Sequence, residues 1–376
     1  MESEISESRG LSRSQFLKAA LALSLGFVPA ARAQGNLLKL AKPLTPVAAQ
    51  PGRVIRTVVG LRPFRPSGYL IRKDKLGTKT LVHNYGHGGC GVTLSWGCAA
   101  QAVDLVKDVQ PSNAAVIGCG VVGLSTARVL QDRGWNVQIY AEHLPPDTTS
   151  NIAGALWSPT ILFHDDEITA DFKKSMQKAT RDSFKSLQLM VGNTYGIKWI
   201  DVYTLRNSAE KETDKIDHAK ELGYDDLYVD VQEIDPASTP FAFDQVRRFS
   251  TMLIEPNTYL PALMRDFLLR GGKIAVRKFE SQNEWKKLPE KFVFNCTGLG
   301  AGALTGDDQI TPIRGQLTFL EPQADVNYCA FSGSLYMFPR ADGILLGGTY
   351  ERTTSLDPDK DKEAEIIKGH AALFKV

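Results

Sequence analysis

The segment that decides the fold is VIGCGVVGL, residues 116–124, in which three glycines follow an apolar run and open a predicted helix. Gly118 allows a tight turn out of a strand, and Gly120 lets a ligand approach the main chain. Gly123 lets the helix pack closely on that strand. Further out, Gly134 ends the helix and the strand NVQIYAE, residues 136–142, follows it. This order predicts a βαβ unit built around a bare turn.

The unit is typical of dinucleotide binding. The helix N-terminus offers main-chain N–H donors and the positive end of a dipole to a pyrophosphate. Glu142 ends the second strand, about 20 residues after the last glycine, where a carboxylate can accept hydrogen bonds from ribose hydroxyls. A carboxylate there favours NAD or FAD over NADP. The alternative is a tight turn that binds no ligand.

The next segment, PPDTTSNIAGALWSP, residues 145–159, combines hydroxyl groups with a small apolar strip. The hydroxyls of Thr148, Thr149 and Ser150 can bind phosphate, and the strip from Ile152 to Leu156 can lie against a flat ring. A hydroxyl-rich loop followed by a core strand is the alternative interpretation.

A second glycine-rich segment, VHNYGHGGCGVTLSWG, covers residues 82–97 and contains five glycines. Because glycine has no side chain, five glycines in one short segment predict that a flat ligand approaches the main chain closely here. The segment stands before the dinucleotide motif in the chain, and this order needs an explanation.

Composition excludes several classes of protein. The 376 residues allow two domains or one large interleaved α/β unit. Lys and Arg number 44 against 42 Asp and Glu, so a net charge of +2 gives no sign of binding to nucleic acid or to a membrane surface. The five cysteines lack metal-ligand spacing and are interpreted as buried small residues. No metal is expected.

Residues 1–33 resemble an export signal, with a basic start, an apolar run at 19–31 and small residues before Gln34. The run is too short to span a bilayer, which takes about 20 residues. SRSQFLK, residues 12–18, resembles a twin-arginine signal with Ser14 in place of one arginine. The signal predicts export to the periplasm or the medium. If it is an ordinary amphipathic helix or no longer used, the protein stays cytoplasmic. Residues 34–52 are interpreted as a linker.

Periodicity and turn residues predict the other elements. Helices are predicted at 93–107, 170–191, from about 258 to 271, and from about 359 to 374. Strands are predicted at 54–60, 81–86, 114–117, 197–206, 246–253, 291–295 and 314–321, with a hairpin turning at 341–343.

Together these segments resemble the D-amino-acid oxidase family of flavoenzymes. The blocks that carry the resemblance are VIGCGVVGLSTARVL, IYAEHLPPDTTSNIAGALW, EPNTYL, FNCTGLGAGAL, IRGQL, LGGTYE, RTVVGLRPFRP and VHNYGHGGCGVTLSWGCA. They cover most of the chain from Arg53 onward. The resemblance implies an α/β fold in which an FAD-binding Rossmann-like domain is interleaved with a mixed-sheet α+β substrate domain.

The order of the blocks differs from that of the family, where the GxRPxRP and HNYGHGG blocks come last. Here they come first, which predicts a circular permutation. Residues 108–113 would then join the segment that is C-terminal in the family to the segment that is N-terminal in the family. A damaged gene is the alternative. The domain order expected is a moved C-terminal part of the FAD domain at 53–107, its dinucleotide-binding βαβ at 108–160, mainly substrate domain at 161–255, FAD domain again at 256–311, and substrate-domain strands with a final helix at 312–376.

The resemblance also implies roles for individual residues. Arg62 matches the arginine whose planar fork grips the substrate carboxylate, with Gly89 beside the substrate, whereas Arg65 is interpreted as structural. No side chain is expected to act as acid or base, and His83 and His87 are interpreted as structural. The residues expected to bind FAD are Gly88, Gly91, Val92, Thr93, Gly118, Gly120, Val121, Val122, Gly123, Glu142, His143, Thr148, Thr149, Ser150, Ala153, Gly154, Ala155, Leu156, Phe279, Thr297 and Gly298.

One segment departs from the family pattern. Family members are expected to present tyrosines over the substrate from the segment before EPNTYL, but FAFDQVRRFSTM, residues 241–252, contains none. It contains Arg247 and Arg248, one of which could pair with a second carboxylate if it points inward. That would suit an acidic D-amino acid. The alternative is a pair of solvated surface arginines.

The expected activity is oxidative deamination of D-amino acids, with hydride passing from Cα to flavin N5 and O2 reoxidising the flavin to give peroxide. The partners are then a small amino acid and O2, and a homodimer is compatible with the resemblance. One alternative is an FAD-dependent oxidase or dehydrogenase of another amino acid or a secondary amine. Another is an inactive relative that binds FAD.

Overall fold

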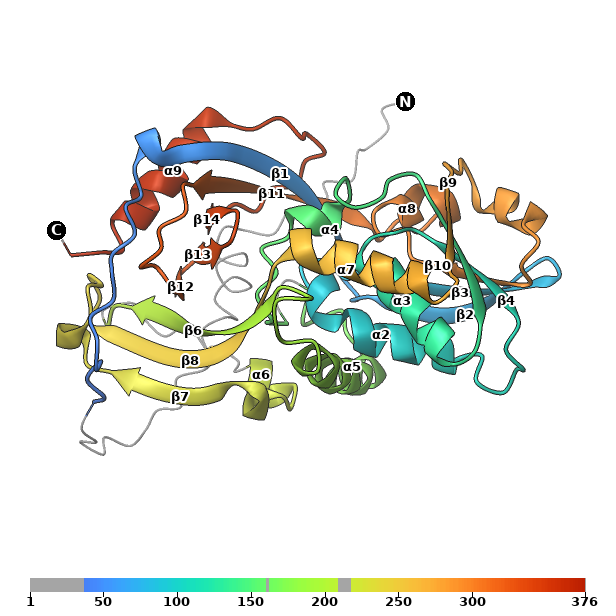
Figure 1. The fold of residues 1–376 in the computed structure, drawn as a ribbon, viewed down its shortest axis with the longest axis horizontal. Coiled ribbons are helices and arrows are strands. Elements are labelled where there is room, and N and C mark those ends of the chain that lie inside the picture. The colour runs from blue at the N-terminus through green and yellow to red at the C-terminus, as the bar shows by residue number, and fades with distance from the viewer. Residues whose placement is uncertain (1–36, 160–161, 209–217, 376) are drawn as a thin grey trace, which may run out of the picture.

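The computed structural model describes residues 37–159, 162–208 and 218–375 and folds them around two β-sheets (Figure 1). Figure 1 shows the eight-stranded sheet on the left and the six-stranded sheet on the right, with the short helix α4 (Thr149–Ile152) where they meet. The proposed export signal lies outside the described residues and stays a prediction.

The six-stranded sheet carries the dinucleotide motif. Its order is β2-β3-β10-β4-β5-β9, and every neighbouring pair is parallel except the hairpin of β2 and β3. A parallel sheet is normally covered on both faces, which explains the apolar runs of its central strands. The strands are β2 (Leu70–Leu76), β3 (Lys79–Tyr85), β4 (Asn113–Ile117), β5 (Asn136–Ala141), β9 (Lys273–Val276) and β10 (Phe292–Asn295).

Helices cover one face of this sheet, where Ala114 and Val116 of β4 join the main apolar cluster. The other face carries Ala115 and Ile117, which pack with Trp285 in a smaller cluster. On the helical face α2 and α3 pack on each other, α5 packs on α2, and α7 packs on α3. These helices are α2 (Gly91–Asp104), α3 (Val121–Asp132), α5 (Ala170–Gln188) and α7 (Pro256–Leu269), and η5 (Gln282–Lys287) and α8 (Gly300–Thr305) follow in the chain.

The predicted βαβ unit forms as β4, α3 and β5. Gly134 adopts φ 82° directly after α3, and the Trp135 N–H donates to the Leu130 carbonyl at 3.1 Å. This geometry confirms the glycine as the residue that ends the helix, because a left-handed residue there satisfies the last carbonyls.

The eight-stranded sheet has the order β1-β11-β14-β13-β12-β6-β8-β7. Its pairs are antiparallel apart from β6 and β12, so the sheet is mixed as expected. The strands are β1 (Val54–Phe64), β6 (Ile197–Arg206), β7 (Val229–Ile234), β8 (Gln245–Ile254), β11 (Thr311–Leu320), β12 (Tyr328–Ser332), β13 (Leu335–Arg340) and β14 (Gly343–Gly347).

The two faces of this sheet have different partners. Helix α9 (Lys360–Ala371) packs on β11, β13 and β14 and buries Ile366 against one face. On the other face Leu317, Phe331 and Phe338 belong to the apolar cluster that also contains the helices of the six-stranded sheet. The remaining described elements are η2 (Pro51–Arg53), α6 (His218–Glu221), η3 (Asp225–Leu227) and η4 (Pro236–Ser238).

The structure differs from the expected organisation at three points. Strand β1 lies in the eight-stranded sheet, paired with β11, although residues 53–107 were expected to belong wholly to the FAD domain. The described part of the expected linker packs on the same sheet, because Val47 and Ala49 are buried beneath it. Helix α2 begins at Gly91, two residues before the expected start.

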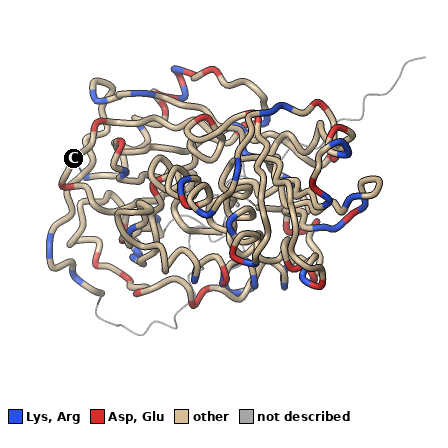
Figure 2. Tube along the Cα trace, turned by 45° about the vertical axis from the view of Figure 1, so that its right-hand side comes forward, with Lys and Arg blue, Asp and Glu red and all other residues tan. Residues whose placement is uncertain are grey.

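The surface carries mixed charge, as the alternating blue and red segments in Figure 2 show. None of the helices in the described ranges is long and apolar enough to cross a bilayer. In those ranges no cluster of three His, Cys, Asp or Glu side chains could hold a metal. All five cysteines are free and buried, in agreement with their interpretation as small core residues.

Candidate active site

A cavity of about 610 Å³ lies between the two sheets. This is within the usual range of ligand pockets, about 300–1,000 Å³. Nearly all the residues expected to bind ligands come together there, although their roles in binding stay predictions. Those lining it are Arg62, Gly88, Gly89, Gly91, Val92, Thr93, Gly118, Gly120, Val121, Val122, Glu142, His143, Thr148, Thr149, Ser150, Ala153, Gly154, Ala155, Leu156, Phe279, Thr297 and Gly298.

The three glycines of the turn between β4 and α3 have distinct surroundings. A Cβ on Gly123 would lie 2.1 Å from the Gly118 carbonyl oxygen, so this glycine lets the helix touch the strand. A Cβ on Gly120 would meet only the Ser150 Oγ, at 3.1 Å. Gly120 therefore leaves free space at the wall of the cavity, whereas Gly123 is a packing glycine and does not line it.

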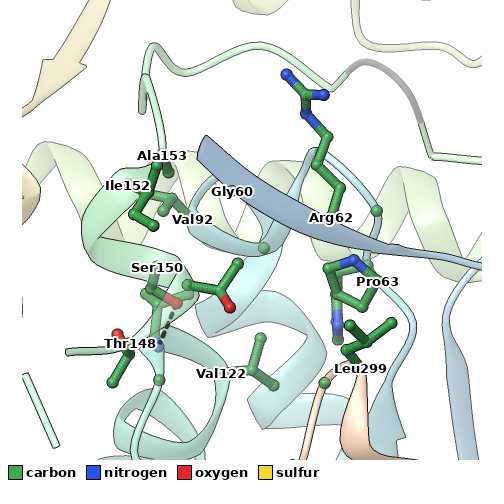
Figure 3. Close-up of a pocket in the computed structure, with 18 of the residues that line it drawn as sticks. Gly60, Arg62, Pro63, Val92, Val122, Thr148, Ser150, Ile152, Ala153 and Leu299 are labelled. Carbon is green, nitrogen blue, oxygen red and sulfur yellow. Dashed lines mark hydrogen bonds between the residues drawn. The ribbon is translucent and has the colours of Figure 1, made fainter. Parts of the chain in front are cut away.

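The N-terminus of α3 meets the predicted hydroxyl segment. The Val121 N–H donates to the Ser150 Oγ at 3.0 Å, and Thr148 donates to Asn151 at 2.8 Å. Figure 3 shows Thr148 and Ser150 on the same side of the pocket as Val122, and Ile152 beside Val92, although Val92 and Val122 come from other parts of the chain. A phosphate group at this position would meet main-chain donors, hydroxyls and the positive end of the helix dipole together.

The far end of the cavity suits an adenosine. Glu142 stands at the end of β5 with its carboxylate about half exposed, 3.7 Å from the Lys278 Nζ. The guanidinium of Arg277 lies over the Phe279 ring at 4.5 Å, and both residues line the cavity. A carboxylate beside a flat aromatic surface matches what a ribose and an adenine need.

The strip from Ile152 to Leu156 runs along the cavity wall. Ala155 adopts φ 59°, which is unusual for a residue with a Cβ. Two hydrogen bonds to its carbonyl groups hold the strip. The Arg340 side chain donates from Nη1 to the Ala153 carbonyl at 2.8 Å, and the Ile254 main-chain N–H donates to the Ala155 carbonyl at 3.0 Å.

The glycine-rich loop before α2 lies against the same turn. A Cβ on Gly91 would be 3.6 Å from the Val121 side chain, so the two glycine segments are neighbours despite their order in the chain. The Gly88 N–H donates to the Pro63 carbonyl at 2.9 Å, which ties the loop to β1. Helix α2 then begins at Gly91 and presents its N-terminal N–H groups toward the cavity.

Titratable side chains around the loop are held in their neutral forms. Burial lowers the pKa of His87 to about 3 and raises the pKa values of Cys119 and Cys296 to about 12. His87 stacks on Tyr69, with ring centroids 5.3 Å apart. These groups remain an uncharged imidazole and two thiols at neutral pH, so none is placed to carry charge to a ligand.

Arg62 carries an unsatisfied donor into the cavity. Its Nη2 donates to the Tyr336 hydroxyl at 3.4 Å, while its buried Nη1 has no hydrogen-bond partner. The guanidinium lies over bare main chain, because a Cβ on Gly315 would be 2.5 Å from Nη1. Figure 3 shows the side chain projecting from β1, well clear of Pro63. A half-buried guanidinium whose buried Nη1 has a free donor is what a carboxylate requires.

Sequence reasoning missed the aromatic side of this site. Tyr336 and Phe338 of β13 line the cavity together with Phe331 of β12, and adjacent rings are 5.2–6.2 Å apart. A tyrosine therefore does face the expected carboxylate, but it comes from the SLYMFPR hairpin and not from residues 241–252. The alternation of the hairpin strand was the available signal, since it places Tyr336 and Phe338 on one face.

Arg247 and Arg248 are not part of the cavity. The Arg247 Nε donates to Glu233 at 2.6 Å, and Arg248 pairs with Asp230 and, at 3.9 Å, with Asp201. Both guanidinium groups are thus engaged with carboxylates of their own sheet. The structure brings neither one to the substrate, and neither is a freely solvated surface arginine.

The residues present fit FAD at each part of the molecule. The helix terminus and hydroxyls fit the pyrophosphate, Glu142 fits the ribose, and the glycines of the loop from Gly86 to Gly91 line the cavity where a flat ring would lie. The free donor of Arg62 remains for a substrate carboxylate.

Comparison with known proteins agrees with this geometry. The family model described as "DAO: FAD dependent oxidoreductase" matches residues 24–105 and 113–376. A D-amino-acid oxidase of Streptomyces coelicolor is 30% identical over 275 residues, covering 71% of this chain and 79% of that protein. A D-aspartate oxidase of Homo sapiens is 29% identical over 265 residues, covering 69% of this chain and 75% of that protein.

Solved structures share the fold. A glycine oxidase from Geobacillus kaustophilus superposes with a TM-score of 0.52 at 14% identity, covering 70% of this chain and 79% of that chain. The match of the family model over most of the chain, with the cavity described above, places the chain in the DAO family of FAD-dependent oxidoreductases, with FAD as its cofactor.

Proposed function

We propose that this protein is an oxidase of D-amino acids with neutral side chains. FAD supplies a two-electron acceptor, and O2 takes the electrons from it to give hydrogen peroxide. The amino acid loses two electrons and two protons to become an imino acid, and O2 takes up both electrons and both protons as it becomes hydrogen peroxide. Water then hydrolyses the imino acid to a 2-oxo acid and ammonia. The chain's own contribution is to bind the carboxylate, orient the Cα–H bond and exclude water.

The observation that carries the proposal is the free Nη1 donor of Arg62 beside the Tyr336 hydroxyl. A carboxylate there could accept bonds from both groups, which would fix the substrate at one end. Gly315 has no side chain, so the Arg62 guanidinium can pack directly against its main chain. Orientation of this kind lowers the barrier because the entropy of alignment is lost on binding and not in the reaction.

The lining of the cavity favours neutral substrates. Phe331, Tyr336 and Phe338 form an aromatic wall near Arg62. The other arginine among the described lining residues, Arg277, lies over Phe279 beside the expected adenosine. A second carboxylate would be buried against the aromatic wall without a cation, which costs several kcal/mol. An acidic D-amino acid is therefore a poor fit.

The proposal is tested by adding amino acids to the FAD-loaded protein without oxygen and following the flavin absorbance. We expect D-phenylalanine and D-leucine to bleach the flavin, and D-aspartate and the L-enantiomers to leave it oxidised. Admitting air should restore the colour and release peroxide. Bleaching only by N-methyl amino acids would favour an amine oxidase, and bleaching that air does not reverse would indicate a dehydrogenase. A flavin that no substrate reduces would identify an inactive relative.

Replacing the carboxylate anchor gives a second test. Arg62→Ala should lower kcat/KM by about a hundredfold, since a paired arginine–carboxylate contact is worth ~3 kcal/mol in a buried site. Arg62→Lys should recover only part of this, because an ammonium cannot form two parallel bonds. Arg53→Ala is the matched control, as Arg53 makes an exposed ion pair with Glu321. Equal kinetics for the Arg62 and Arg53 variants would contradict the assignment.

We further propose that the chain is a circular permutation of the family order. The family model matches it in two stretches, with residues 106–112 between them. In the structure these residues form the short connection from α2 to β4. The segments before β1 and after α9 bind the same turn: the Leu40 N–H donates to the Ser238 Oγ at 3.2 Å, and the Lys375 N–H donates to the Pro240 carbonyl at 2.8 Å. Only a short bridge would be needed to restore the family order.

A further inference from the structure

The last helix carries a fully buried histidine between two carbonyl groups. The His370 Nε2 lies 3.0 Å from the Tyr336 carbonyl oxygen, and its Nδ1 lies 2.7 Å from that of Ile366. The side chain is 0% exposed. The first contact crosses from α9 to β13, whereas the second stays within α9.

The residue that His370 contacts is the one whose hydroxyl meets Arg62. The Tyr336 ring lies on bare main chain, because a Cβ on Gly347 would be 2.1 Å from it. Next to His370, a Cβ on Gly369 would be 2.9 Å from the Leu335 side chain, so α9 approaches β13 closely at this point. Tyr336 is thus held at its main chain by α9, at its ring by β14 and at its hydroxyl by Arg62.

We propose that His370 is a positioning residue of the substrate site, which fixes the main chain of Tyr336 and thereby the phenol beside Arg62. The inference rests on the proposed function in that it takes the Arg62 end of the cavity as the carboxylate site. It assigns to α9, which does not line the cavity, a role in holding the carboxylate anchor.

The number of protons on the ring sets the strength of this contact. Carbonyl oxygens only accept, so both contacts are hydrogen bonds only when His370 is an imidazolium. A neutral ring has one N–H and leaves a lone pair facing the other carbonyl. Burial lowers the pKa of His370, and the two carbonyls oppose that shift. We place the single N–H of the neutral ring on Nε2, facing the Tyr336 carbonyl. The second proton, on Nδ1, therefore binds only below the usual pKa of about 6.5, and the charge that it adds should tighten the contact with Tyr336.

The charged groups on the elements packed against His370 are either paired with other side chains or, for Asp361 and Lys368, exposed at the surface of α9. On β13 Arg340 pairs with Asp342, and on β11 Arg314 pairs with Glu351. Strand β14 is GILLG and has no titratable side chain. Within α9 the titratable residues are Lys360, which pairs with Glu363, Lys362, which pairs with Glu365, and Asp361 and Lys368. Glu363 also accepts from Thr57 of β1.

Three variants separate the two contacts. In His370→Gln the amide nitrogen reaches as far as Nε2 and can still donate to Tyr336, without titrating. In His370→Asn the shorter side chain reaches only the Nδ1 position, so the contact to Tyr336 is lost. Tyr336→Phe, alone and combined with His370→Asn, tests whether the effect acts through the phenol.

The measurement is the Kd of benzoate, an aromatic carboxylate without an amine, read from the flavin spectrum of the FAD-loaded protein between pH 5.5 and 8. We expect His370→Asn to bind it about fivefold more weakly at pH 7, as for the loss of one hydrogen bond, and His370→Gln to match the original protein there. Below pH 6.5 the original protein should bind more tightly, and His370→Gln should not. In the Tyr336→Phe background the Asn substitution should have no further effect.

Equal affinities for the Gln and Asn variants at every pH would overturn the inference, as would an undiminished Asn effect in the Tyr336→Phe background. If the original protein binds FAD but not benzoate, and D-amino acids fail to bleach it, the proposed function itself fails. The two failures are therefore distinguishable.

Discussion

At the scale of single residues, His87 links burial to the pH dependence of stability. Its side chain is 2% exposed, and burial lowers its pKa to about 3. In the unfolded chain the ring takes up a proton near the usual pKa of about 6.5, which the folded protein excludes. The contribution of His87 to the unfolding free energy is therefore fully present above pH 6.5. It is lost as the pH falls toward 3, because the unfolded chain binds a proton that the folded protein does not.

His87→Gln should remove this dependence. Between pH 7 and pH 4.5 the neutral ring should lower the unfolding free energy of the original protein by roughly 2–3 kcal/mol. The loss of unfolding free energy over the same pH range should be smaller by this amount in the variant. Urea unfolding at the two pH values measures the difference. Burial also lowers the pKa values of His83 and His370, but both residues are present in both proteins, so their contributions cancel in the comparison. A parallel loss in both proteins would contradict the burial argument.

Single residues also show what the sequence could place. Arg62 was expected at the ligand site because the short motif around it resembles the family's, and it does line the cavity, while its role as carboxylate anchor stays a prediction. Tyr336 was missed because its position depends on contacts that no short motif records: the bare backbone of Gly347 under its ring and the β13 register that turns it toward Arg62. The same holds for Arg247, whose partner Glu233 lies on the neighbouring strand.

At the scale of elements, the turn between β4 and α3 separates packing from binding. Gly123→Ala would place a Cβ 2.1 Å from the Gly118 carbonyl oxygen and force the helix off the strand. Gly120→Ala would meet only the Ser150 Oγ, at 3.1 Å, and would intrude on the cavity. The first change should lower stability, and the second should mainly lower FAD affinity.

We expect Gly123→Ala to cost at least about 2 kcal/mol of unfolding free energy in the FAD-free protein, and Gly120→Ala less than about 1 kcal/mol. Gly120→Ala should weaken FAD binding at least tenfold, which titration of flavin fluorescence measures. The pair forms its own control, since both substitutions add the same methyl group three residues apart. Equal FAD affinities for Gly120→Ala and the original protein would show that the turn does not approach the cofactor.

The bounds of several strands were predictable, whereas the polar edge strand β2 and the short strands β9 and β12 were missed. β6 has the predicted bounds, and β4 and β8 are within one residue of theirs, because most of their residues are apolar, aromatic or β-branched. β2 was missed because LIRKDKL is mostly charged, as befits the edge of a sheet. α2 begins early because Gly91 continues the bare loop into the first helical turn.

At the scale of the whole molecule, the sheet to which β1 belongs could not be read from its residues. VIRTVVGLRPF predicts a strand, but its partner β11 lies about 250 residues further along the chain, and only the pairing places Arg62 at the cavity. Pairing over such a separation depends on the complete fold. The proposed permutation has the same character, since it would change the order of the chain and leave the neighbours of each element in place.

The permutation predicts that the chain can be relinked into the family order. The new chain would begin at Asn113, run to Lys375, continue through a flexible bridge of about four to ten residues into Leu38, and end at Lys107. The bridge can be short because Leu40 and Lys375 bind the same turn, at Ser238 and Pro240. The new ends would lie in the exposed connection between α2 and β4, where breaks are tolerated.

We expect the relinked protein to fold, to bind FAD with an unchanged flavin spectrum, and to unfold within a few degrees of the original. The control is a second rearranged chain that has the same bridge but begins at Phe294 and ends at Val293, inside the buried strand β10. It should fail to fold, because this break removes parallel pairing on both sides of the strand. Thermal unfolding and flavin absorbance compare the three proteins. Two outcomes would contradict the permutation. One is that the relinked protein fails to fold at every bridge length, and the other is that opening the chain inside β10 is tolerated as well as opening it between α2 and β4. In either case the connection from α2 to β4 does not join what are the C-terminus and the N-terminus in the family order.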